Sequence, residues 1–180
     1  MERFMPPHGG NVSETYPLTI GPPDAFVIHC SSPRFAQAFN KFIADLDVTH
    51  PIRIVVPGSV SSIGGGIELI LSKQFKVLKD QIEILVKEHP TMTPRFILIN
   101  HEDCRGYDYL EKKYGHVLRR LARYTDVMKK QEIDLQLAAK VICAIARQYL
   151  RGATVELYMA RIVDGEARFD TLVDTRNAAA

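Results

Sequence analysis

Residues 25–34, AFVIHCSSPR, begin the pattern that decides the fold. The run from Ala25 to Cys30 is mostly apolar and has the length of a buried strand, and the Ser-Ser-Pro after it ends the strand. From Arg34 to Leu46, apolar residues recur at the spacing that places them on one face of a helix. The segment therefore predicts a strand, a short turn and an amphipathic helix.

The same alternation of strand and helix continues along the chain, and most of the later elements are visible as apolar runs or periodic stripes. They are expected as strands at 52–56 and 95–100, helices at about 66–88, 107–128 and 131–150, and two alternating runs at 154–163 and 166–173. Asp164-Gly165 joins the last two runs, and Asp-Gly in such a position is a strong signal for a β-hairpin.

This order predicts an α/β fold with a mostly parallel sheet, helices on both faces and a C-terminal antiparallel hairpin. Residues 1–23 are dense in Pro and Gly and are expected to form an irregular arm. Residues 24–180 are expected to form a single α/β domain that binds zinc, as the motifs below indicate. The carboxyl ends of parallel strands meet at one edge of a sheet, which would bring together residues 30–34, 57–66 and 100–106.

The composition is that of a soluble globular protein, with 46% hydrophobic and 24% charged residues. The net charge of +2 gives no electrostatic reason to expect a nucleic acid or an anionic membrane as partner. No window approaches the ~18 consecutive apolar residues of a membrane span. The chain has only three cysteines, too few for a disulfide framework and an odd number that cannot all pair. We therefore expect reduced thiols in the cytoplasm.

Three residues at the expected strand ends form a candidate metal site. Cys30 ends one strand, and His101 and Cys104 follow the end of another in a His-x-x-Cys pattern. Two thiolates and one imidazole suit Zn²⁺, and three protein ligands leave a fourth position open, as in catalytic sites. The residues alone also allow another interpretation, in which the two cysteines are small buried apolar residues and His101 caps a strand end.

The motifs resemble those of the β-class carbonic anhydrases, whose usual pattern is Cys-x-Asp-x-Arg followed later by His-x-x-Cys. The resemblance rests on Cys30 and Arg34, on the Gly/Ser loop after the next strand, and on His101 and Cys104, and it covers about residues 24–175. It implies a Zn²⁺ ion held by the two cysteines and the histidine, and reversible hydration of CO₂ to bicarbonate. It also implies a homodimer or higher homo-oligomer with the site near the subunit interface.

The chain departs from the family pattern beside the ligands. Ser32 stands where the family has the Asp that pairs with the Arg, and Asn100 and Arg105 stand where Gly is usual. Arg34 and Ser32 are the candidate catalytic residues, with Ser32 the weaker, because a hydroxyl can accept a hydrogen bond but cannot hold a guanidinium as a carboxylate does. Loss of such a partner typically costs roughly 10–100-fold in activity or affinity. Ser32 also cannot become an anionic fourth ligand.

Arg34 therefore needs another anion, and Glu102 and Asp103 are close enough in sequence to provide it. Alternatively, Arg34 and Arg105 together favour an anionic substrate larger than bicarbonate, unless Arg105 simply points to solvent.

Other residues receive plainer interpretations. His29 is not expected to be a ligand, because adjacent strand residues point to opposite faces. Cys143 is expected in the core, and Lys129 and Lys130 on a solvated helix face.

The leading interpretation is a zinc lyase that hydrates CO₂, with a small molecule as substrate. Two alternatives remain open at this point. One is a diverged zinc-binding protein with a binding or regulatory role and little hydratase activity. The other is a hydrolase that acts on a small molecule similar to CO₂.

Overall fold

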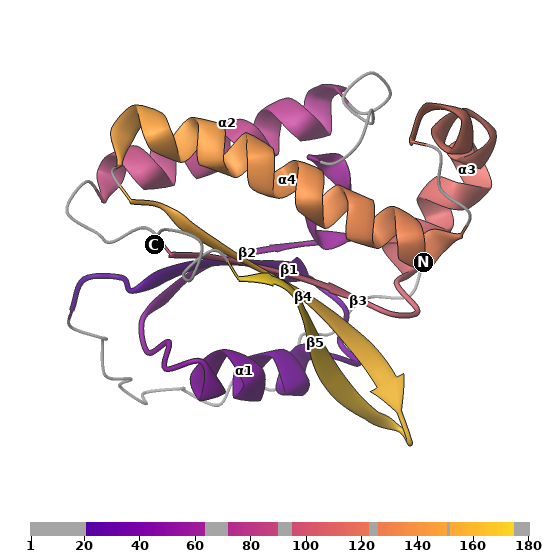
Figure 1. Cartoon of the computed structure of the whole chain (residues 1–180), viewed down its shortest axis with the longest axis horizontal. Helices are drawn as coiled ribbons and strands as arrows, with labels where there is room; N and C mark the ends of the chain where they lie inside the picture. The colour runs from indigo at the N-terminus through magenta and orange to yellow at the C-terminus, as the bar shows by residue number, and fades with distance from the viewer. Residues whose placement is uncertain (1–20, 64–71, 90–94, 123–125, 151, 175–180) are drawn as a thin grey trace, which may run out of the picture.

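The computed structural model describes residues 21–63, 72–89, 95–122, 126–150 and 152–174 (Figure 1). Its elements, in chain order, are β1 (Ala25–Cys30), α1 (Ala36–Asp45), β2 (Pro51–Val56), the 3-10 helix η1 (Ser59–Ser62), α2 (Ser72–Glu88), β3 (Arg95–His101), α3 (Arg105–Ala122), α4 (Val127–Tyr149), β4 (Thr154–Val163) and β5 (Glu166–Asp174). Most of the expected N-terminal arm, residues 64–66 of the Gly/Ser loop after the second strand, and the expected start of the second helix lie outside the described residues.

The strands form one five-stranded sheet in the order β2-β1-β3-β4-β5. The pairs β1–β2, β1–β3 and β3–β4 are parallel, and β5 is antiparallel to β4. The turn between the last two strands is made by Asp164 and Gly165, both with positive φ, as a tight hairpin requires. The predicted α/β fold, with its mostly parallel sheet and C-terminal hairpin, is confirmed.

Helices cover both faces of the sheet (Figure 1). On one face, Phe39 and Ile43 of α1 pack with Val27 and Ile97 of the sheet. On the other face, α2 and α4 pack against strand residues of the opposite parity, among them Phe26. Because successive strand residues point to opposite faces and helices cover both faces, every residue of β1 is buried, which explains why the strand is mostly apolar. None of the helices in the described ranges has the length and hydropathy needed to cross a membrane.

The boundary between α3 and α4 differs from the expected one. The sequence predicts one helix to about 128 and the next from 131, whereas α4 begins at Val127. The reason is Asp126, whose side chain accepts a hydrogen bond of 2.8 Å from the backbone N–H of Lys129 and so caps the helix. The consequence for the site is that Val127 packs against the cluster of Cys30, Cys104 and Tyr107 rather than ending α3.

Candidate metal centre

The side chains of Cys30, His101 and Cys104 converge at the carboxyl edge of the sheet. Cys30 is the last residue of β1, His101 is the last of β3, and Cys104 directly precedes α3. All three are buried, and their candidate ligand atoms lie within 4.8 Å of one another. The structure thus brings together the three residues that the sequence predicts as metal ligands.

The geometry of these side chains fits a zinc ion. The sulfurs of Cys30 and Cys104 are 3.7 Å apart, close to the ~3.8 Å between two sulfurs that each bind a tetrahedral zinc at about 2.3 Å. Nδ1 of His101 lies 2.7 Å from the carbonyl oxygen of Glu102, to which it donates in the neutral tautomer. Nε2 of His101 is then a buried acceptor without a partner among the described residues. A metal ligand needs such an oriented lone pair.

Backbone N–H groups surround the two sulfurs. The N–H of Gly58 donates to Sγ of Cys30 over 3.4 Å, and the N–H groups of Gly106 and Tyr107, at the start of α3, donate to Sγ of Cys104. The pKa of Cys30 is lowered to about 4, chiefly because the thiol of Cys104 donates to its sulfur. The same hydrogen bond, together with burial, raises the pKa of Cys104. The pair therefore favours a thiolate, the form that binds metals.

Two glycines allow the loop after β2 to pack directly on the start of α3. Gly58 has a φ of 76°, in the left-handed region. A Cβ added at Gly106 would lie 2.7 Å from the backbone nitrogen of Gly58, so no side chain fits there. This contact brings the N–H of Gly58 to Cys30. Arg105 directly follows Cys104, and the close approach occurs one residue later, at Gly106.

A cavity of about 420 Å³ adjoins the centre, and its walls come from all three segments that the sequence predicts to meet. Ser32, Arg34, Asp103 and Arg105 line it, together with Cys30. Both residues expected to act in catalysis, Ser32 and Arg34, are thus placed beside the candidate ligands.

Asp103, not Glu102, pairs with Arg34. The carboxylate of Glu102 instead accepts a hydrogen bond of 2.8 Å from the backbone N–H of Ile162 in β4. Of the two candidate partners from the sequence, the structure therefore selects Asp103.

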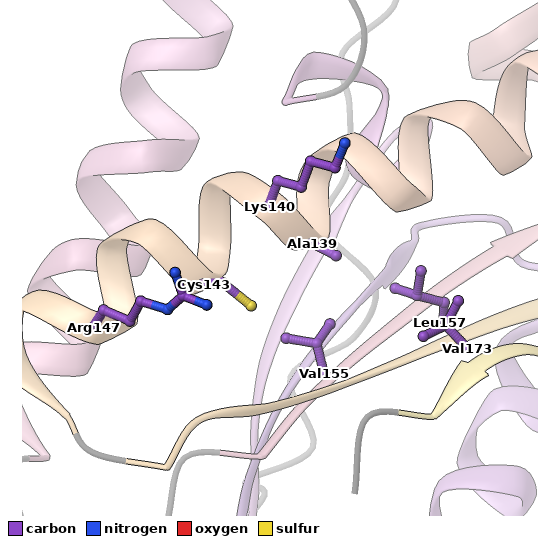
Figure 2. A pocket seen from close by; sticks show the side chains of 7 residues that line it. All are labelled: Ala139, Lys140, Cys143, Arg147, Val155, Leu157 and Val173. Atoms are coloured by element: carbon purple, nitrogen blue, oxygen red, sulfur yellow. The ribbon is translucent and has the colours of Figure 1, made fainter. Parts of the chain in front are cut away.

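Neither His29 nor Cys143 belongs to the group of candidate ligands. The ring of His29 packs against Phe39 of α1, and its Nδ1 lies 2.9 Å from the carbonyl oxygen of Cys30. Cys143 is partly buried and packs against the core, as expected, at the wall of a separate cavity of about 250 Å³ between α4 and the β4–β5 hairpin. Figure 2 shows its sulfur pointing toward Val155. Burial raises the pKa of this thiol, although Arg147 acts in the opposite direction.

A buried polar network behind the cysteines was not predicted. Tyr107 packs against Cys30 and Cys104. Its hydroxyl accepts a hydrogen bond of 3.1 Å from Nδ2 of Asn100 and donates to the carboxylate of Asp134.

Lys130 completes this network through an ion pair with Asp134. Lys130 is buried, so its interpretation as part of a solvated helix face is wrong. The two residues are four apart on α4, a spacing that is usual on exposed helix surfaces, and only the packing of α4 behind the site encloses them.

The fold of the chain resembles that of a solved structure, although the sequence itself gives no match. No family model matches the chain, and no curated protein matches it in sequence. The crystal structure of β-carbonic anhydrase isoform I from the protozoan Trichomonas vaginalis aligns with a TM-score of 0.53 and 13% identity. The alignment covers 89% of this chain and 88% of that one. At this identity the likeness shows a fold similar to that of a β-carbonic anhydrase.

Proposed function

We propose that this protein is a zinc-dependent, carbonic anhydrase-like lyase that hydrates CO₂ reversibly to bicarbonate, as a diverged member of the β-class family. The observation that carries the proposal is the convergence of Cys30, His101 and Cys104 beside a cavity. The likeness of the fold to a β-carbonic anhydrase supports it. Because the three cysteines are free, a reducing compartment such as the cytoplasm suits the site.

The chemistry that zinc supplies when held by three protein ligands is the activation of water as a nucleophile near neutral pH. The residues of the chain would prepare the site for it. The Glu102 carbonyl fixes the tautomer of His101 so that Nε2 faces the two sulfurs. The N–H groups of Gly58, Gly106 and Tyr107 favour the ionised form of the sulfurs.

The cavity suits a small substrate that enters neutral and leaves as an anion. Its charged lining residues, Arg34, Asp103, Arg105 and Asp108, carry two positive and two negative charges, so the wall as a whole favours neither sign. In our proposal the hydroxyl of Ser32 accepts a hydrogen bond from the reacting water, and Arg34 lies near the bicarbonate that forms.

We further propose that the protein is a homodimer or higher homo-oligomer. A groove lined by Val77 of α2 and Tyr109 of α3 shares Pro57 and Gly106 with the site cavity. Val77 and Tyr109 are both more than half exposed, and Ile84 of α2 adds a further exposed apolar side chain. Apolar surface of this kind supports a protein interface beside the site. Val77→Asp is expected to lower the oligomeric state measured by light scattering, with Val163→Asp as a control on the distant hairpin.

Metal analysis and stopped-flow kinetics test the function. The purified chain should hold about one zinc ion and should hydrate CO₂. Cys104→Ser should abolish both properties, whereas Cys143→Ser, at a cysteine outside the site, should change neither. A folded protein that never binds zinc would refute the proposal. A zinc-loaded protein inert toward CO₂ would favour a binding or regulatory role, and turnover of a similar small molecule instead would favour the hydrolase.

A further inference from the structure

The ion pair between Arg34 and Asp103 joins the two loops that carry the cysteines. Arg34 lies in the loop that follows Cys30, and Asp103 directly precedes Cys104. Both side chains line the site cavity, as does Ser32. The pair therefore forms part of the cavity wall, between the two segments that carry the candidate thiolate ligands.

Stability does not account for this arrangement. Both side chains of the pair are more than half exposed, and exposed ion pairs contribute little to stability. The backbone of Asp103 has a φ of 57°, in the left-handed region that Asp adopts more readily than most residues with a Cβ. The place of both side chains at the cavity wall points instead to a role in the cavity.

The electrostatics of the cavity explain what that role is. Position 32 is a neutral serine, and within the described part of the chain the carboxylate that contacts Arg34 is that of Asp103. Without this carboxylate, the guanidinium of Arg34 would face the cavity as a free anion-binding group beside Arg105. It would then hold an anionic product tightly and would be free to change its position.

We propose that Asp103 is the positioning residue of this site. It fixes Arg34 at the cavity wall, and it supplies from the loop after β3 the carboxylate that position 32 lacks. This inference rests on the proposed function for its kinetic consequence, whereas its consequence for anion binding does not depend on turnover.

Four variants of the full chain test whether the carboxylate of Asp103 fixes Arg34 and takes the place of one at position 32. Asp103→Asn removes the charge and keeps the size, and Asp103→Glu keeps the charge. Ser32→Asp combined with Asp103→Asn moves the carboxylate to position 32, and Ser32→Asp alone adds a second carboxylate. Asp47→Asn is the matched control, because Asp47 is also an exposed aspartate with a left-handed φ, of 58°, but lies outside the site cavity.

Each variant is loaded with Co²⁺, and the dissociation constant of thiocyanate is measured from the visible spectrum. Asp103→Asn is expected to bind thiocyanate about tenfold more tightly, because it releases Arg34 to bind anions. It should also lower kcat/KM for CO₂ hydration by roughly 10–100-fold. Ser32→Asp in the Asp103→Asn background, and Asp103→Glu, should reverse most of both changes. Ser32→Asp alone should alter each by less than about threefold.

Two results would overturn the inference. One is an Asp103→Asn protein whose thiocyanate affinity matches those of the parent and of Asp47→Asn. The other is a large gain in activity from Ser32→Asp alone, which would mean that the carboxylate is missing rather than moved. A parent that binds Co²⁺ but does not hydrate CO₂ would refute the proposed function, while the thiocyanate measurements would still decide the role of Asp103.

Discussion

Two ion pairs flank the candidate metal centre, and they differ in burial. The side chains of Arg34 and Asp103, at the cavity wall, are 61% and 56% exposed. Those of Lys130 and Asp134, in the network behind Tyr107, are 4% and 0% exposed. Substitutions in the exposed pair change the free energy of unfolding little, so these residues can act in the site without affecting the fold. The buried pair is tolerated only when it is complete, because an unpaired buried charge is strongly destabilising.

The largest effect is expected where the buried pair is broken. Lys130→Met should lower the free energy of unfolding by about 3–5 kcal/mol, because it leaves the carboxylate of Asp134 buried without its cation. Urea denaturation measures this loss. Lys129→Met is the matched control, because Lys129 is exposed and pairs with Glu132 at the surface, where a pair is worth at most about 1 kcal/mol.

A double variant sharpens this prediction. Lys130→Met with Asp134→Asn removes both charges and keeps an acceptor for the hydroxyl of Tyr107. It should recover at least half of the stability that Lys130→Met loses, because no buried charge remains unpaired. Equal losses in the single and double variants would show that packing, not charge, sets the cost.

The pH dependence of stability is the next largest effect. Burial raises the pKa of Asp134 from its ordinary 3.8 to about 6. Between about pH 4 and about pH 6 the folded state therefore binds more protons than the unfolded state. The stabilisation that protonated Asp134 gives the folded state is fully present below about pH 4 and is lost as pH rises through about 6. The size of the change is about 3 kcal/mol. Unfolding measured between pH 4 and 7 should show this slope in the parent but not in the Lys130→Met/Asp134→Asn variant.

A smaller effect is expected at the hydroxyl of Tyr107, the residue whose side chain packs on the cysteines and belongs to the network. Tyr107→Phe should cost about 1–2 kcal/mol, because it removes the acceptor for Nδ2 of Asn100 and the donor to Asp134. Thermal or urea unfolding measures the loss. Tyr109→Phe, two residues along α3 and exposed, should cost much less. Equal costs at the two positions would mean that the buried network contributes nothing beyond packing.

The smallest effect on stability is expected at the cavity wall. Arg34→Ala and Asp103→Asn should each change the free energy of unfolding by less than about 1 kcal/mol. Asp103→Asn should nevertheless change anion affinity and turnover, as described above. If either substitution destabilises the fold as much as Lys130→Met does, the distinction between an exposed functional pair and a buried structural pair is lost.

Much of the fold and the candidate site could be predicted, because the information is local. Strand and helix periodicities indicate the alternating order of elements, and parallel strands must end at one edge. That edge brings Cys30 close to His101 and Cys104 without any knowledge of packing. The choice of Asp103 over Glu102 could not be predicted, because the backbone of Ile162, which holds Glu102, belongs to a strand far along the chain.

The sequence by itself determined the α/β order, the hairpin and the three candidate ligands, since short-range patterns and strand direction are sufficient for these. Only the tertiary structure decided that Lys130 and Asp134 are buried and that Arg34 finds its partner in Asp103. The physical reason is that burial and charge pairing depend on which distant segments enclose a side chain. An identical Lys-x-x-x-Asp spacing would be an ordinary exposed pair on a helix that did not pack behind the site.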